Sequence, residues 1–139
     1  MYIFIKSIFV VIVFVLYTSL TGCTSIRVDS TIRDPYLAGL GDIVSTEVAL
    51  ASGAVEMNPL GPGGAYLFKG IYLFVIRPGL STQDRIKGDR MATSLWWGAT
   101  INNVLQVVMP GMAVVGMGIG IMSGVSIYQY QRDNEPDGR

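Results

Sequence analysis

The sequence predicts an all-α fold, a small helical membrane bundle in which three to four short apolar helices follow a cleaved signal peptide. Three observations predict it. Charged residues make up 14% of the chain, against about 25% in ordinary soluble domains. Apolar stretches of helical length alternate with breaks rich in Gly and Pro. The first apolar stretch ends at the only cysteine, Cys23, where an export signal would be cut.

Residues 1–22 have the order of regions of a secretory signal peptide. Lys6 supplies the positive start, residues 8–16 are apolar, and a polar approach ends in Leu-Thr-Gly-Cys at 20–23. This small-residue run resembles the cleavage site of bacterial lipoproteins. The resemblance implies cleavage between Gly22 and Cys23, with covalent diacylglycerol and an N-acyl chain on Cys23. Several acyl chains anchor a protein stably to a membrane.

Lipidation at Cys23 predicts a place in the bacterial cell envelope with the N-terminus periplasmic. The inner membrane is favoured over the outer one, because helical spans belong there and outer-membrane spans are barrels. Residues 23–34 are expected to form a tether. The alternative is an uncleaved transmembrane anchor at residues 3–20, whose length permits a span.

The rest of the chain is expected to form one helical membrane-associated domain at residues 35–130. Asp34 as N-cap and Pro35 at the first helical position predict a first helix that reaches about Ala54. The later elements are a turn at 57–64, a second helix at 65–76, a charged loop at 77–90 in which Ser81 and Asp89 each cap a short helix, a third helix at 91–109, a fourth at 112–127 and a polar tail at 131–139. Trp96 and Trp97 are expected at a membrane interface.

The number of spans depends on the first helix. If all four helices span, loop 77–90 lies on the side of Cys23 and most Lys and Arg residues are outside, against the positive-inside rule. If the first helix lies at the surface, three spans place this loop in the cytoplasm. Asp42 near the centre of that helix costs about 2.5–3.5 kcal/mol on insertion, which favours three spans. A small periplasmic bundle without spans is the remaining alternative.

Ionisable residues within the first two helices predict an ion pair. Helical spacing places Asp42 and Thr46 on one face of the first helix. A hairpin with its turn near residues 58–62 would bring Lys69 to the level of Glu47, with Asp42 deeper. We therefore predict a structural pair from Lys69 to Glu47 or Asp42 that locks these helices together. The sharper alternative is a proton or ion relay.

A turn motif joins these two helices. Gly53, Glu56, Asn58 and Pro59 have the residue types of a turn, and we expect them to serve turn geometry rather than catalysis. The pattern over residues 40–76 resembles a family of small bacterial membrane proteins of unknown function, in which an Asp/Thr helix, a Glu-x-Asn-Pro-Leu turn and a Lys-bearing helix follow one another. The resemblance implies a membrane-helix fold and no assigned activity.

Small residues and amides in the last two helices predict close helix packing. Gly116, Gly120 and Gly124 recur every fourth residue, a spacing that lets membrane helices approach closely. The neighbour is either another helix of this chain or a second copy in a homo-oligomer. Asn102 and Gln106 share a face and are expected to form interhelical hydrogen bonds rather than to line a pore.

Function is bounded mainly by exclusion. The chain has no histidine and one cysteine, so no catalytic site, metal site or cofactor beyond the lipid is predicted. Nucleic acid is not an expected partner, because the net charge is zero and no basic excess is clustered. The favoured prediction is a lipid-anchored envelope protein with an interaction or structural role, whose partners are membrane lipid, an envelope protein or a second copy. The alternatives are an oligomeric channel or holin-like permeabiliser, and an outer-membrane lipoprotein with a periplasmic bundle.

Overall fold

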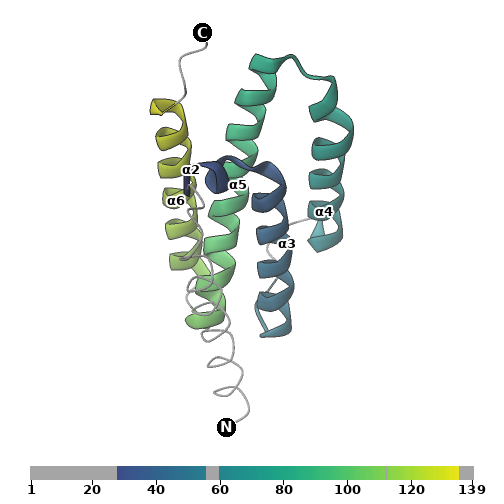
Figure 1. Ribbon diagram of the computed structural model, residues 1–139. Coiled ribbons are helices and arrows are strands. Elements are labelled where there is room, and N and C mark those ends of the chain that lie inside the picture. The colour runs from purple at the N-terminus through teal and green to yellow at the C-terminus, as the bar shows by residue number, and fades with distance from the viewer. Residues whose placement is uncertain (1–27, 56–59, 112, 135–139) are drawn as a thin grey trace. The chain divides into compact units, whose positions relative to one another are not determined.

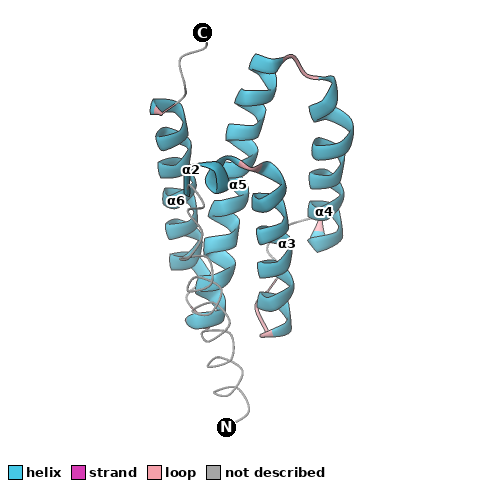
Figure 2. Cartoon of the chain, viewed as in Figure 1, coloured by secondary structure: helices cyan, strands magenta, loops and turns pink. Residues whose placement is uncertain are grey.

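A computed structural model describes residues 28–55, 60–111 and 113–134. These residues form helices joined by short turns, with no strand among them (Figure 2), so the predicted all-α class is confirmed. The chain divides into one unit that ends at Thr31 and a second that begins at Ile32, and the description below concerns the second. The expected signal peptide with Cys23, and the turn residues Glu56, Asn58 and Pro59, lie outside the described residues.

Four long helices make up the second unit, preceded by a short helix that begins in the first. The elements are α2 (Val28–Arg33), α3 (Pro35–Ala51), α4 (Gly61–Ile71), the π-helical turn η1 (Tyr72–Ile76), the 3₁₀ turn η2 (Arg77–Gly79), α5 (Thr82–Val108) and α6 (Ala113–Asp133). α5 is central, because it packs against both α3 and α6. α3 and α5 run in one direction, and α4 and α6 run in the other (Figure 1).

The ends of α3 are set by local chemistry. Asp34 caps its start as predicted, since its carboxylate accepts hydrogen bonds from the backbone N–H groups of Tyr36 and Leu37. The helix ends at Ala51 rather than near Ala54. Gly53 follows at φ +92°, a left-handed conformation in which a glycine avoids the Cβ clash of other residues.

The start of α4 differs from the prediction. Residues 61–64 were expected in a turn, but they form the first helical turn of α4. Pro62 lies within that turn. Backbone N–H groups there have no acceptor inside the helix, so proline, which has no N–H, loses no hydrogen bond. Together α4 and η1 therefore form a longer helical segment, residues 61–76, than the expected 65–76.

The predicted charged loop is mostly helical. Ser81 caps α5 by accepting a hydrogen bond from the backbone N–H of Asp84, as expected. The expectation that Asp89 caps a second short helix is wrong, because Asp89 lies inside α5 and binds the Arg77 guanidinium through both carboxylate oxygens. One continuous helix results.

α6 extends past the expected end at residue 127 and takes in the start of the predicted tail. Its last turn is held by Gln131, whose Nε2 donates to the Ile32 carbonyl at 2.9 Å and to Thr93 Oγ1 at 3.1 Å. Arg33 adds a hydrogen bond to the Asn134 carbonyl at 2.8 Å. The start of α3 and the end of α6 therefore lie at the same end of the bundle.

The buried core is small. Ala38, Leu73, Ala92 and Trp96 form its apolar cluster. The expectation that Trp96 lies at a membrane interface is wrong, because its ring is buried here and meets Tyr72 edge to face, with ring centroids 5.9 Å apart. The indole fills the space that the small side chains of α3 leave.

Candidate functional site

A buried ion pair joins α3 to α4. Lys69 Nζ lies 2.9 Å from Asp42 Oδ2, and the two side chains are 6% and 8% exposed. Of the two acids considered for Lys69, the structure thus brings Asp42 to it. Glu47 is exposed on α3 and accepts a hydrogen bond from the Tyr66 hydroxyl at 2.7 Å instead.

Asn103 on α5 binds the other side of this pair. Its Nδ2 donates to Asp42 Oδ1 at 3.2 Å, to Ser45 Oγ at 3.2 Å and to Thr46 Oγ1 at 2.8 Å. An amide nitrogen carries two protons, so the three acceptors share them. The ion pair and this amide therefore tie α3, α4 and α5 together at one level of the bundle.

Sequence reasoning missed the role of Asn103. Asn102 and Gln106 were expected to form the interhelical hydrogen bonds, because they share a helix face. Asn103, the neighbouring amide, faces α3 instead. Which amide of α5 faces α3 depends only on how α5 is rotated about its axis relative to α3. The one signal in the sequence was a run of amides in an otherwise apolar segment.

The surroundings of Lys69 offset part of the cost of burying its charge. The Tyr66 and Trp96 ring centroids lie 5.8 and 5.9 Å from Nζ, within the range of cation–π attraction. Buried charges are tolerated when they are paired and hydrogen-bonded, whereas removal of one partner leaves an uncompensated charge. Each of these two side chains is therefore needed to compensate the buried charge of the other.

A polar cavity of about 210 Å³ adjoins the pair. Its wall combines a carboxylate, an ammonium, a hydroxyl and three amides from α3, α4 and α5. These polar lining residues are Asp42, Thr46, Lys69, Asn102, Asn103 and Gln106. Such a wall offers hydrogen-bond donors and acceptors and carries no net charge.

The predicted glycine ladder faces α5. Gly116, Gly120 and Gly124 are buried, and a Cβ built on Gly120 would lie 2.6 Å from the Gly98 carbonyl oxygen. A Cβ on Gly118 would meet nothing within 4 Å. Of the two neighbours considered, the ladder therefore contacts another helix of this chain, in the close approach that small residues permit.

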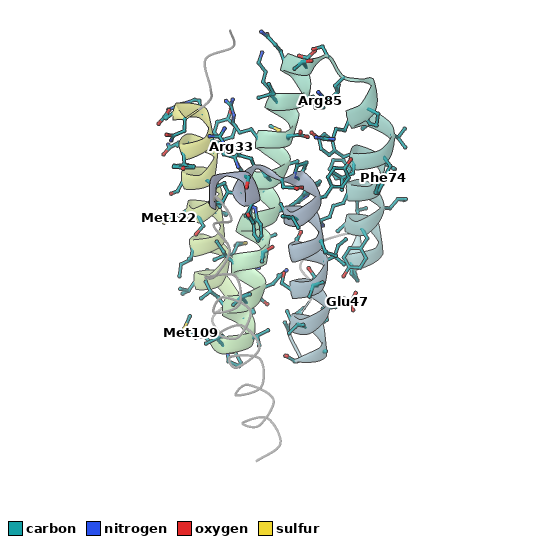
Figure 3. The ribbon with its side chains drawn as sticks, in the orientation of Figure 1. Arg33, Glu47, Phe74, Arg85, Met109 and Met122 are labelled. Atoms are coloured by element: carbon teal, nitrogen blue, oxygen red, sulfur yellow. The ribbon has the colours of Figure 1, made fainter. Side chains whose placement is uncertain are left out.

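Charged side chains gather at one end of the bundle, called here the basic end. The described Lys and Arg residues other than Lys69 lie there, at the end of α2, in η2, in the first three turns of α5 and in the last turn of α6: Arg33, Arg77, Arg85, Lys87, Arg90 and Arg132. In Figure 3 Arg85 marks this end and Met109 the opposite, turn end. The hydrogen bond to Asp89 raises the pKa of Arg77 above its usual value, so this guanidinium stays charged.

The turn end has no Lys or Arg among its described residues, which are 51–55, 60–64, 105–111 and 113–115. The described Lys and Arg residues other than Lys69 are therefore confined to one end of the bundle, where Asp34, Asp84, Asp89 and Asp133 also lie. Within the described part of the chain, no group of three His, Cys, Asp or Glu side chains converges as a metal site would require. What the arrangement can do chemically is bind polar groups by hydrogen bonds around one buried ion pair.

Comparisons with known proteins assign no function to this chain. The resemblance of residues 40–76 to small bacterial membrane proteins stays a prediction. No protein-family model, curated protein or solved structure matches the chain.

Proposed function

We propose that this chain is an integral protein of the bacterial cell envelope, with a structural or interaction role rather than an enzymatic one. Its proposed spans are α3, the α4–η1 segment, residues 91–108 of α5, and α6. The proposed anchor is lipid on Cys23, and the proposed location is the inner membrane. Membrane lipid is then its first partner, and an envelope protein or a second copy is the candidate for another.

The observation that carries this proposal is the distribution of side chains. Apart from Leu73, Trp96 and Val107, the buried residues are small or polar. Asp42, Lys69 and Thr93 are among the polar ones. Large apolar side chains instead cover the outside of α4–η1, α5 and α6. They include Leu67, Phe68, Phe74, Val75, Met91, Leu95, Val114, Ile121 and Met122. In water this arrangement would expose the residues that normally drive folding, whereas a bilayer would solvate them.

The proposed spans differ in length and in apolar character. By length and composition, one described helix, α6, can cross a membrane by itself. α3 has 17 residues, or about 25 Å at 1.5 Å per residue, slightly less than the hydrocarbon core of about 30 Å. Thinning of the bilayer accommodates such a mismatch. Because Asp42 and Lys69 neutralise each other, α3 and α4 would enter the bilayer as a pair.

Four spans are better supported than three. The three-span alternative requires the first helix to lie at the membrane surface. α3 instead packs along α5, and its Asp42 points into the bundle toward Lys69 and Asn103. Separation of α3 from its neighbours would leave Lys69 buried without a counter-ion.

Two sequence features predict opposite orientations of the bundle in the membrane. With four spans, the basic end and Cys23 lie on one side of the membrane. Lipid on Cys23 would make that side periplasmic, whereas the positive-inside rule would make it cytoplasmic. We retain the periplasmic orientation, because residues 1–23 have the order of regions expected of a lipoprotein export signal.

Alkaline phosphatase fusions after Ala54, Gly88 and Arg139 test the orientation. This reporter is active only in the periplasm, so activity is expected after Gly88 and Arg139 and not after Ala54. Activity after Ala54 alone would overturn the four-span arrangement with a periplasmic basic end. It would support either three spans, or four spans behind an uncleaved segment 3–20 whose N-terminus is periplasmic, and labelling of Cys23 would distinguish them.

Membrane fractionation tests the proposal as a whole. The wild-type chain should stay in the inner-membrane pellet after an alkaline wash. So should Cys23→Ser, made with residues 1–22 replaced by a signal peptide that is cut without lipidation, because helices hold the chain without lipid. Radioactive palmitate should label the wild type and not the variant. Release of Cys23→Ser by the wash would contradict spanning helices, and an unlabelled wild type would contradict the lipid anchor.

The alternatives have less support. A permeabilising oligomer built on the glycine ladder would need a face that α5 already occupies. A periplasmic bundle on an outer-membrane anchor would expose the apolar side chains of α4–η1 and α6 to water. Collapse of the membrane potential on expression would favour the permeabilising oligomer. Recovery in the outer-membrane fraction would favour the periplasmic bundle.

A further inference from the structure

The cavity beside the ion pair is lined by charged and polar side chains together with small and apolar ones. Thr46, Asn103 and Gln106 contribute a hydroxyl and two amides to its wall. Lys69 Nζ carries three protons, and the described residues place one carboxylate, Asp42, beside it. An unsatisfied buried polar group costs about 1–3 kcal/mol, so the remaining ammonium protons favour an occupant that accepts hydrogen bonds.

The lining residues show which way the cavity extends. From Asp42 and Lys69 it runs to Ala54, Val55 and Gln106 at the turn end, where Val55 is 79% exposed. Toward the basic end the apolar cluster of Ala38, Leu73, Ala92 and Trp96 fills the interior. Solvent at the turn end is therefore nearer to the ion pair than solvent at the basic end.

We propose that this cavity is a water-filled vestibule that opens at the turn end and hydrates the Asp42–Lys69 pair from that side of the membrane. The inference rests on the proposed membrane placement, without which the pair would meet water on every side. Polar cavities hold water where apolar ones stay dry. A volume of about 210 Å³, at about 30 Å³ for each molecule in liquid water, has room for several.

Water suits this wall better than an ion does. The carboxylate and the ammonium cancel each other, so neither a cation nor an anion finds an excess of opposite charge. Water can accept from Lys69 Nζ and donate to the hydroxyl and amide oxygens of the wall at once. Hydration also lowers the cost of keeping two charges within a bilayer.

Cysteine accessibility tests the vestibule. Ala49 and Ala65 line the cavity on α3 and α4, and each is replaced singly by Cys in the full chain. Leu67, which is 65% exposed on the outside of α4, and Ala38, which is 0% exposed in the apolar cluster, are the matched control positions. The probe is sulfonatoethyl methanethiosulfonate, which is charged and does not cross membranes. The wild-type chain gives the baseline for Cys23.

The thiolate is the reactive species, and an apolar environment raises the thiol pKa. Ala49→Cys and Ala65→Cys should therefore react at least about tenfold faster than Leu67→Cys and Ala38→Cys. Spheroplasts and inverted vesicles expose opposite faces of the membrane, and reaction is expected in only one of them. It should be the same one in which Ser52→Cys reacts, since Ser52 is exposed at the end of α3.

The outcomes separate the two proposals. Rapid reaction of Leu67→Cys would show water around the bundle and overturn the membrane placement. Slow reaction at Leu67, Ala49 and Ala65 alike, with Ser52→Cys reactive, would overturn the vestibule alone. Equal labelling of Ala65→Cys from both faces would overturn its one-sided opening. If Ala49→Cys fails to accumulate, Ala65→Cys decides, because its side chain is already partly exposed.

Discussion

The contact between α5 and α6 gives the sharpest quantitative prediction, for Gly120→Ala. The new Cβ would lie 2.6 Å from the Gly98 carbonyl oxygen and 3.0 Å from Asn102 Cβ. Ordinary van der Waals contact begins near 3.4 Å, so α5 and α6 must separate locally by about 0.8 Å, the difference between those two distances. Overpacking of this kind costs about 1–3 kcal/mol. The obstacle is backbone, which cannot move aside as a side chain can.

Gly118→Ala is the matched control, because its Cβ would meet nothing within 4 Å. Both substitutions gain the helix propensity of Ala over Gly, about 0.5–1 kcal/mol. The difference between the two variants therefore isolates the contact. Gly118→Ala should be neutral or slightly more stable than the wild type, and Gly120→Ala should be less stable than Gly118→Ala by about 1–3 kcal/mol.

The measurement is equilibrium unfolding in mixed micelles of dodecyl maltoside and sodium dodecyl sulfate, followed by circular dichroism and Trp fluorescence. Equal free energies of unfolding for Gly118→Ala and Gly120→Ala would refute the packing of the ladder against α5. A concentration-dependent loss confined to Gly120→Ala would instead assign the ladder to contacts between copies.

The same unfolding assay tests four more substitutions. Lys69→Met should lower the free energy of unfolding by about 3–5 kcal/mol, because it leaves the buried Asp42 carboxylate without a counter-ion. Adding Asp42→Leu should restore most of the loss. A double variant no more stable than Lys69→Met would contradict the pairing. Asn103→Leu removes a donor shared by three acceptors and should cost about 1–3 kcal/mol, so an unchanged stability would exclude that role. Tyr72→Phe loses the hydrogen bond to Asp89 and should cost about 0.5–1.5 kcal/mol. Glu47→Gln should change stability by less than about 0.5 kcal/mol, as expected for an exposed side chain, and a larger loss would return Glu47 to the buried pair.

Much of the secondary structure could be predicted from the sequence, because its causes are local. Asp34 and Ser81 cap α3 and α5 as their residue types predict, and Gly53 adopts the left-handed conformation that ends a helix. Prediction failed where a distant group outcompeted a local role. Asp89 was expected to cap a helix, but Arg77 supplies a charged partner that binds both of its oxygens.

The candidate site was predictable as a set of residues and not as an arrangement. Composition and spacing singled out Asp42, Glu47 and Lys69 as groups that need partners in an apolar chain. They could not decide between the two acids, because that choice depends on how α3 is rotated against α4 and α5. Asn103 was passed over for the same reason.

The sequence by itself determined that this chain forms largely apolar helices with caps, a glycine ladder, and a few ionisable groups in the first two helices that need partners. Only the tertiary structure decided that Lys69 binds Asp42, that the ladder meets Gly98, and that a polar cavity lies beside the pair. Caps and periodicity act over a few residues along the chain. Pairing across helices is set instead by rotation and distance between segments that lie far apart in sequence, and packing alone fixes those.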